Sequence, residues 1–326
     1  MSPDWGRAVK IVDGADRVCL ACHIRPDADA LGSMVAVALA LHGRGQRVVA
    51  SLGDEPFAVP AILRFLPGLD LLSPPAVYPA RPEVMLSFDA ASIDRLGALA
   101  RPAAAAAELI VLDHHASNTG FGTVSLVDPD AAATAVLAVG LIDQLGLPLT
   151  RDVALGLYAG LVTDTGSFKF SATTPQVHGL AARLIAAGVD PAAVSRELYD
   201  RAPFGYLGML AAALGRAQLD RAAAHSRGLV WTTVTRADRT PSNLPLDAAE
   251  SVIDVIRRTD EAEVAAVLKE DDNGGWQVSV RSKEFIDVGI ACTELGGGGH
   301  ARAAGFSYTG RPGEAIGALM RALDEQ

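Results

Sequence analysis

Apolar runs of strand length alternate with stretches of helical periodicity over the first 145 residues of the chain. The helical stretches include Ala28–Leu41 and Ala131–Leu145, which are long and largely apolar. Strand and helix patterns that alternate in this way indicate βαβ units, and therefore an α/β domain whose parallel sheet carries helices on both faces. The expected strands are 17–22, 47–51, 84–88, 109–112 and 123–127.

Helical patterns then continue without strands to residue 219, with prolines at helix starts and Gly188 as a helix breaker. The expected helices are Asp152–Thr163, Pro175–Ala187, Pro191–Tyr199 and Phe204–Leu219. Residues 220–228 are polar and lose the periodicity, so we expect a linker there. Residues 1–219 are therefore assigned to the first domain.

A different pattern begins at residue 229. Strand runs and helical stretches occur in mixed order up to residue 326, which predicts a smaller mixed α/β domain over 229–326. Two domains agree with the length of 326 residues, because single cores rarely keep growing in chains of this size. The expected elements are strands at Leu229–Val234, 263–269 and 276–282 and helices at Asp247–Arg258, 287–295 and Pro312–Leu323.

The composition is typical of a globular protein in a reducing compartment. Half of the residues are hydrophobic and 20% are charged, without a long block of like charge. The three cysteines do not suggest a disulfide framework, and we interpret Cys19 and Cys22 as core residues of a buried strand. The chain shows no signal-peptide pattern and no apolar run of the roughly 18 residues that a membrane span needs. We therefore expect a cytoplasmic protein without membrane contact.

Acidic and imidazole side chains follow four separate apolar elements. Ligands of parallel sheets bind beyond the carboxyl ends of the strands, so we expect these side chains to converge. Two aspartates in a surface loop are common, but a surface loop does not explain why acids follow all four elements. The candidate residues are His23, Asp27, Asp29, Asp89, Asp113, His114, His115 and Asp164.

This set of residues predicts a metal site. Asp164 ends an apolar helix, where a negative charge is unfavourable unless a cation compensates it; a simple turn at Thr165 and Gly166 is the alternative reading. Mixed histidine and aspartate ligation favours transition metals such as Mn²⁺ over Mg²⁺ or Ca²⁺. The candidates are too many for one ion that must also bind substrate. Two ions that share one carboxylate would suit phosphoryl displacement, so we start from a two-metal phosphoesterase.

A run of four glycines precedes a histidine inside the second domain. Consecutive glycines let backbone N–H groups approach an anion closely, and nearby basic side chains would add donors. We interpret the run as an anion cradle, with a flexible linker as the alternative. Arg281 and Lys283 end the preceding strand and would complete the cradle, with a solvated strand end as the alternative. The residues concerned are Gly297, Gly298, Gly299, His300, Arg302, Arg281 and Lys283.

The net charge of the chain is −10. Long nucleic acids usually require a basic surface, so long duplex nucleic acid is not an expected partner. The acidity remains compatible with a short phosphate substrate, because divalent cations would offset several of the site carboxylates.

Together these motifs resemble the DHH phosphoesterase superfamily, which is named for the sequence Asp113-His114-His115. The order of the motifs, ending in the glycine run before His300, is similar to the two-domain branch in which a DHH-associated domain follows the catalytic DHH domain. The resemblance covers nearly the whole chain. The compact architecture looks like that of the bacterial bifunctional oligoribonucleases and pAp phosphatases.

The resemblance also implies a role for each residue. One Mn²⁺ would be held by His23, Asp27 and Asp89, and a second by Asp29, Asp89, His114 and Asp164, with Asp89 bridging; Mg²⁺ or Co²⁺ could substitute. His115 would contact the substrate phosphate, and Asp113 would orient the histidines. Arg281 and His300 of the second domain would bind the far phosphate or nucleotide.

The implied activity is hydrolysis of short oligoribonucleotides, including pApA, to mononucleotides, and of 3′-phosphoadenosine 5′-phosphate (pAp) to AMP. Cyclic di-AMP is a further candidate substrate. A hydroxide that bridges the two ions would attack phosphorus. Relatives in this family often form homodimers. The alternatives are a single-stranded DNA exonuclease or a pyrophosphatase of the same superfamily, and a non-catalytic nucleotide sensor.

Overall fold

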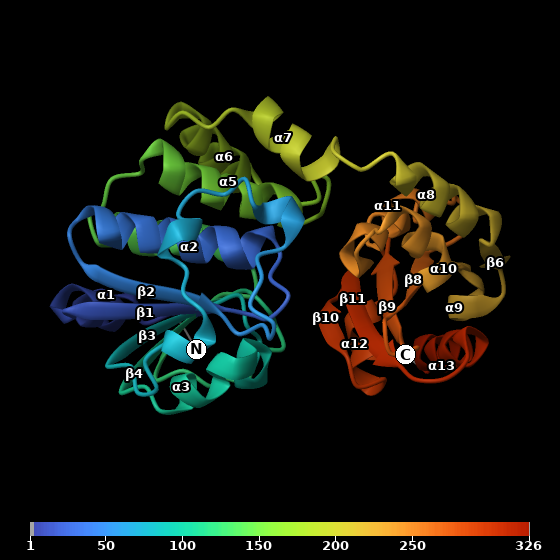
Figure 1. Ribbon diagram of the computed structural model, residues 1–326, viewed down its shortest axis with the longest axis horizontal. Helices are drawn as coiled ribbons and strands as arrows, with labels where there is room; N and C mark the ends of the chain where they lie inside the picture. The colour runs from blue at the N-terminus through green and yellow to red at the C-terminus, as the bar shows by residue number, and fades with distance from the viewer. Residues whose placement is uncertain (1–2, 326) are drawn as a thin grey trace. The chain divides into compact units, whose positions relative to one another are not determined.

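The computed structural model describes residues 3–325, and the chain divides into two compact units, Met1–Arg201 and Ala202–Gln326 (Figure 1). Each unit contains its own sheet and hydrophobic core. The boundary expected from sequence, at residue 219 with a linker over 220–228, lies inside the second unit.

Three elements occupy the region around that expected boundary: α8 (Gly205–Gly215), β6 (Gln218–Asp220) and α9 (Ala223–Ser226). Met209 of α8 is buried in a core with Val230, and β6 pairs with the next strand of the second sheet. The apolar periodicity of α8 predicts a buried helix face, but it does not say which domain that face packs against.

The first unit is built on a five-stranded parallel sheet with the order β2-β1-β3-β4-β5. Apart from their first residues, β1 and β4 are buried, and β3 is buried throughout. Strands covered on both faces carry continuous apolar runs, which is the pattern seen in the sequence. The expected strands are confirmed to within one residue: β1 Arg17–Cys22, β2 Arg47–Leu52, β3 Val84–Phe88, β4 Glu108–Asp113 and β5 Val124–Val127.

Helices cover the two faces of this sheet unequally. Figure 1 shows α2, α5 and α6 on one side of the sheet and the short α3 on the other. On the α3 side, Leu96 and Leu99 of a 3₁₀ segment pack against Met85 of β3. The helices are α1 Trp5–Gly14, α2 Ala28–Gly43, α3 Ala100–Ala104, α4 Thr134–Gln144, α5 Arg151–Asp164, α6 Pro175–Ala186 and α7 Pro191–Tyr199, with 3₁₀ segments at Ala61–Leu63, Leu69–Leu71, Pro75–Val77 and Ile93–Leu99.

Helices α2 and α5 approach each other closely at two glycines. A Cβ atom on Gly32 would lie 2.3 Å from the carbonyl oxygen of Gly156, and a Cβ on Gly156 would lie 2.6 Å from that of Gly32. Real Cβ atoms do not approach backbone oxygen this closely, so the contact requires glycine on both helices. The contact brings the first turn of α2 against α5, where a Cβ on Gly160 would lie 2.6 Å from Oδ1 of Asp29.

The second unit is a six-stranded mixed sheet with the order β10-β11-β9-β8-β7-β6. Strands β7 and β8 are parallel, and the other pairs are antiparallel. Val280 and Ala304 face a core with α12 and α13, while Ala265 and Val267 face a core with α8 and α11. The strands are β7 Leu229–Val234, β8 Val264–Glu270, β9 Trp276–Ser282, β10 Gly298–His300 and β11 Ala303–Tyr308.

Two features of this unit differ from expectation. The helix expected over Asp247–Arg258 is a 3₁₀ segment, Leu246–Ala249, followed by the short α11, Val252–Ile256. The glycine run, for which no strand was expected, ends in strand β10, which pairs with β11. The remaining helices are α10 Arg236–Arg239, α12 Val288–Glu294 and α13 Pro312–Asp324, with a 3₁₀ segment at Thr240–Ser242.

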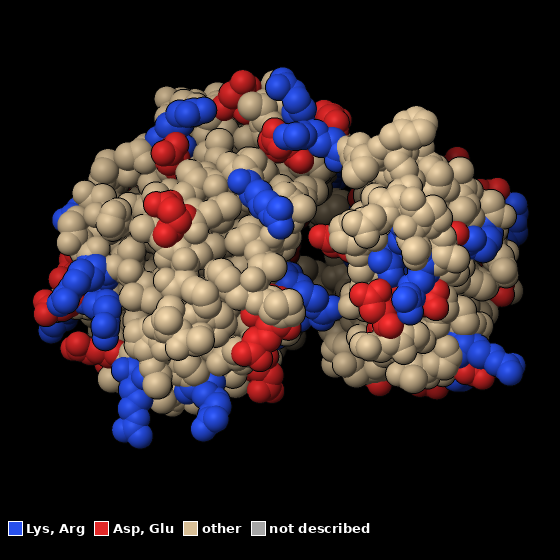
Figure 2. Space-filling view, viewed as in Figure 1, with Lys and Arg blue, Asp and Glu red and all other residues tan. Residues whose placement is uncertain are grey.

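Within residues 3–325 no single helix is both long and apolar enough to cross a membrane; α6 and α7 pass that test only as a pair, bent by 106°. The three cysteines are free and buried, as expected for core residues. Figure 2 shows basic and acidic side chains interspersed on the visible face of each unit.

Candidate metal centre

The site lies at the carboxyl ends of β1, β3 and β4. The chain places β2 on one side of β1 and β3 on the other, so the order of the strands switches between β1 and β3. In open parallel sheets, ligands bind at this switch point. His23 directly follows β1, Asp89 directly follows β3 and His114 directly follows β4.

Asp89 lies at the centre of the site. Its Oδ2 is 3.5 Å from Nε2 of His23, and its Oδ1 is 3.5 Å from Nε2 of His114. Oδ1 also accepts a hydrogen bond of 2.9 Å from the hydroxyl of Thr134. The backbone of Asp89 has a φ of 56°, a left-handed conformation that is uncommon outside glycine and that aspartate and asparagine tolerate better than most residues. The carboxylate therefore lies between two imidazoles that come from different strands.

His23, Asp27 and Asp89 form one candidate ion site, with ligand atoms within 4.8 Å of one another. Asp27 is the N-cap of α2: its Oδ1 accepts hydrogen bonds of 3.0 Å from the N–H groups of Asp29 and Ala30. Its Oδ2 faces Nε2 of His23 at 3.8 Å. Nδ1 of His23 lies 2.9 Å from the neighbouring backbone carbonyl, and the tautomer that carries its proton on Nδ1 would present the Nε2 lone pair to a cation.

Asp29, Asp89 and His114 form a second candidate site with the same spacing of ligand atoms. Nε2 of His114 is 3.1 Å from Oδ2 of Asp164, the last residue of α5, and 3.9 Å from Oδ2 of Asp29. Nδ1 of His114 donates to the carbonyl of Ala131 (3.0 Å), which again directs Nε2 towards the carboxylates. The structure thus brings together the six residues expected as metal ligands.

Asp29 is fully buried and lies against the N-terminus of α4. Its Oδ2 accepts from the N–H of Thr134 (2.6 Å), and its Oδ1 accepts from the N–H of Ala135 (2.9 Å) and the hydroxyl of Ser33 (3.2 Å). A helix N-terminus carries a partial positive charge that stabilises an acid. The orientation of Asp29 is therefore set by α4 as well as by its own helix.

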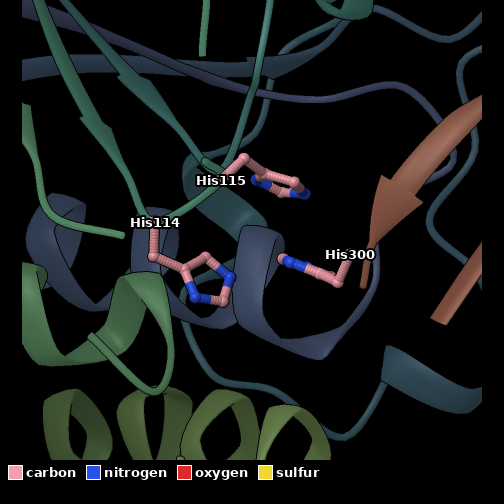
Figure 3. Close-up of side chains that lie close together, drawn as sticks. All are labelled: His114, His115 and His300. Carbon is pink, nitrogen blue, oxygen red and sulfur yellow. The ribbon is translucent and has the colours of Figure 1, made fainter. Parts of the chain in front are cut away.

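Asp113 and His115 form a pair beside this centre. Nδ1 of His115 donates to Oδ1 of Asp113 (2.7 Å), and the side-chain amide of Asn118 donates to Oδ2 of the same carboxylate (2.6 Å). Figure 3 shows His114 and His115 at the end of their strand. Their ring centroids are 5.3 Å apart. Asp113 thus orients His115, whereas His114 takes its orientation from the carbonyl of Ala131.

The electrostatics of the site fit divalent cations. Burial, together with the charges of Asp164 and Asp89, raises the pKa of Asp29 well above its usual range. Burial also raises the pKa of Asp164 to about 6, although its hydrogen bond with His114 opposes this. Burial lowers the pKa values of His23 and His114, but the carboxylates beside them outweigh this and raise the values to about 10 and about 11. Repulsion among buried carboxylates is the condition that a bound cation relieves, so the donor set fits metal ions.

The expected substrate-binding residues of the second unit separate into two groups. Arg281, Ala303 and His300 are paired across β9, β11 and β10, so the side chains of Arg281 and His300 share one face of the sheet. The guanidinium of Arg302 instead donates to the carbonyl of Ile286 (2.7 Å), and Nζ of Lys283 donates to a backbone carbonyl (2.6 Å). Arg302 and Lys283 thus bind the backbone of their own unit.

In the glycine run, Gly297, Gly298 and Gly299 form the approach to β10 and its first residues. Gly299 has a φ of 141°, and a Cβ there would lie 2.5 Å from the carbonyl oxygen of Ala303. This close strand pairing explains the glycine at that position. Gly298 lies on the same face of the sheet as His300, because alternate residues of a strand point to the same side.

Sequence reasoning did not find Thr134 and Asn118. Thr134 is the first residue of α4, and Asn118 lies in the loop after β4. Their partners are carboxylates of the site, and both are buried or partly buried. Nothing in the local pattern distinguishes these two side chains from ordinary helix-start and turn residues.

Comparison with known families agrees with this geometry. The model of the DHH family N-terminal domain matches residues 17–161, and the model of the DHHA1 domain matches residues 233–326. The first match contains every candidate ligand except Asp164. The second contains all of the expected substrate-binding residues.

Curated relatives and a solved structure resemble nearly the whole chain. The bifunctional oligoribonuclease and PAP phosphatase NrnA of Thermus thermophilus is 32% identical, covering 93% of this chain and 86% of the relative. A probable NrnA of Streptococcus mutans is 26% identical, covering 89% of each chain. The crystal structure of an exopolyphosphatase-related protein from Bacteroides fragilis has the same fold, with a TM-score of 0.86 at 20% identity over 98% of this chain and 95% of that chain. From these matches and the arrangement of its site, we conclude that the chain belongs to the DHH family of phosphoesterases.

Proposed function

We propose that the protein is a metal-dependent phosphohydrolase that cleaves short oligoribonucleotides to mononucleotides and converts pAp to AMP. The observation that carries this proposal is Asp89, whose two carboxylate oxygens each lie 3.5 Å from a different imidazole. A carboxylate in this position is suited to ligate two metal ions that act on the same phosphate. The relatives named for both activities support the class of substrate.

The residues that would hold the ions divide into two sets that share Asp89. The donors mix imidazole nitrogen and carboxylate oxygen, which favours Mn²⁺. When bound, the ions would neutralise charge on the phosphate oxygens and lower the pKa of the attacking water. The first set is His23, Asp27 and Asp89, and the second is Asp29, Asp89, His114 and Asp164.

Other residues of the chain would position the substrate. Asp113 orients His115 through Nδ1, and the ring of His115 would contact a phosphate oxygen of the substrate. In the second unit, Arg281 and His300 share one face of the sheet and would bind the far phosphate or nucleotide. The net charge of −10 favours substrates of a few nucleotides over long duplexes.

The test is a substrate panel with the purified full-length protein and Mn²⁺. The panel contains pApA, pAp, a labelled RNA 5-mer, cyclic di-AMP, pyrophosphate and long single-stranded DNA, and the products are followed by chromatography. We expect mononucleotides from pApA and the 5-mer and AMP from pAp, with all turnover lost on chelation and in the Asp89→Asn variant.

Each other outcome identifies a different function. Turnover of pyrophosphate or long single-stranded DNA, without cleavage of the dinucleotide, would replace the proposal by a pyrophosphatase or an exonuclease. Nucleotide binding without turnover of any compound would identify a sensor.

A further inference from the structure

Four polar side chains form a hydrogen-bonded group on one side of the second unit's sheet. Oε2 of Glu250, which precedes α11, contacts Nζ of Lys269 and accepts from the hydroxyl of Ser279 (2.9 Å). Oε1 of the same carboxylate accepts from Nη2 of Arg281 (3.2 Å). Nζ of Lys269 also donates to the hydroxyl of Ser279 (2.9 Å). One carboxylate therefore contacts two cations.

Small residues of β11 and β10 lie beside this group on the same face of the sheet. Ser279 and Arg281 alternate along β9, and across β11 they are paired with Gly305 and Ala303. Gly305 and Ala303 are in turn paired with Gly298 and His300 of β10. Paired residues of adjacent strands point to the same face, so a strip of glycine and alanine runs from Arg281 towards His300. The face beside Arg281 therefore carries small side chains along this strip.

The group carries one net positive charge, because its one carboxylate is paired with two basic side chains. Burial raises the pKa of Glu250, but the charges of Lys269 and Arg281 outweigh this and lower it to about 2, so the carboxylate is ionised at neutral pH. The side chain of Lys269 is 8% exposed, whereas that of Arg281 is 23% exposed. Nearby Arg257 is paired with Asp254 (3.9 Å), which balances its charge. Glu250 thus neutralises the charge of the buried Lys269. The net positive charge of the group therefore lies on the more accessible guanidinium of Arg281.

We propose that Glu250 sets the relative affinity of the second unit for remote substrate groups of different charge. With Glu250 present, the group offers a single positive charge, which matches a phosphodiester. The carboxylate beside Arg281 lowers the affinity for a terminal phosphomonoester, which carries nearly two negative charges, without excluding the terminal phosphate of pAp or pApA. This inference rests on the proposed function for the role of Arg281 in substrate binding, and it adds a residue that limits the affinity for terminal phosphates.

The direct test measures nucleotide binding rather than turnover. The full-length protein and its Glu250→Gln variant are titrated calorimetrically, in the presence of EDTA, with 5′-AMP and with the monomethyl ester of 5′-AMP. The two ligands have nearly the same shape, but at pH 8 the ester carries one negative charge and 5′-AMP carries two. Removing one negative charge a few ångströms away should strengthen binding of 5′-AMP about tenfold more than binding of the ester.

Two control variants separate charge from structure. Glu250→Asp keeps the negative charge and should retain the wild-type ratio of the two affinities. Glu261→Gln removes a partly exposed glutamate of the same unit, which pairs with Arg221 (3.0 Å), and should also leave the ratio unchanged. The melting temperature of each variant is measured in parallel, because Lys269 without its carboxylate partner could destabilise the unit.

The outcomes distinguish this inference from the proposed function. If Glu250→Gln changes the affinities for both ligands by the same factor, Glu250 acts only on structure and the inference is wrong. The inference also fails if neither ligand binds to any of the folded proteins. Because the titration requires neither metal nor turnover, failure here does not affect the substrate panel, which tests the function independently.

Discussion

The hydroxyl of Thr134 donates a hydrogen bond of 2.9 Å to Oδ1 of Asp89, while the N–H of the same residue donates one of 2.6 Å to Oδ2 of Asp29. Thr134 therefore holds two of the carboxylates that we assign to metal ions. Hydrogen bonds to ligating groups orient them, and their loss commonly lowers metal affinity ten- to a hundredfold.

Substitution of this hydroxyl should weaken metal binding without unfolding the protein. Thr134→Val keeps the shape and the backbone N–H but removes the donor to Asp89, so we expect the Mn²⁺ affinity to fall about tenfold or more. Thr134→Ser retains the hydroxyl and should restore most of the affinity. Isothermal titration with Mn²⁺ measures both variants; wild-type affinity of Thr134→Val would show that the hydroxyl has no role in positioning Asp89.

Asp89→Asn should abolish turnover while the fold is retained. Asparagine tolerates the φ of 56° and can still accept the hydrogen bond from Thr134. It removes the charge between the two ion sites, so we expect kcat to fall about a thousandfold or more.

The matched control for this variant is Asp94→Asn, because Asp94 is exposed and lies five residues further along the chain. The control should keep normal activity and a normal melting temperature. Near-normal turnover of Asp89→Asn with Mn²⁺ would remove the basis of the two-ion assignment.

Mn²⁺ should stabilise the first unit selectively, since the six residues that we expect to ligate the ions lie within residues 1–201. At a free concentration a hundred times the dissociation constant, an ion that binds only the folded state adds about 2.7 kcal/mol. For a unit of this size the melting temperature would rise by about 5–10 °C. Hydrogen exchange followed by peptide mass analysis assigns the stabilisation to a unit, and EDTA should reverse it. Equal protection of both units would contradict this prediction.

Gly32→Ala should destabilise the first unit, because the new Cβ would lie 2.3 Å from the carbonyl oxygen of Gly156. Forcing apart two packed helices typically costs about 1–3 kcal/mol, and here the displaced helices also carry Asp29 and Asp164. Gly43→Ala in the same helix is the control, since a Cβ there meets no atom within 4 Å. Urea unfolding of the three proteins measures the difference; equal stabilities would show that α2 and α5 separate without cost.

Local patterns in the sequence were sufficient for the fold class and the candidate ligands. Buried parallel strands require continuous apolar runs, so the strands of the first unit could be located to within one residue. The acids and imidazoles lie at the ends of those runs, in the first turn of the helix after β1, or at the end of an apolar helix in the case of Asp164, and a parallel sheet collects such positions at one edge. The convergence of these side chains was therefore predictable from adjacent residues alone.

Tertiary structure decided the contacts between residues that are distant in the chain. Asp29 meets Thr134 across 105 positions, and Glu250 meets Arg281 across 31. The packing of α8 on the second sheet and the pairing of the glycine run as β10 likewise depend on partners elsewhere in the chain. Periodicity reports which face of an element is buried, but it carries no information about which element covers that face. Local patterns thus predicted most of the elements and the positions of their polar groups, because these depend on neighbouring residues, whereas packing determined which residues those groups contact.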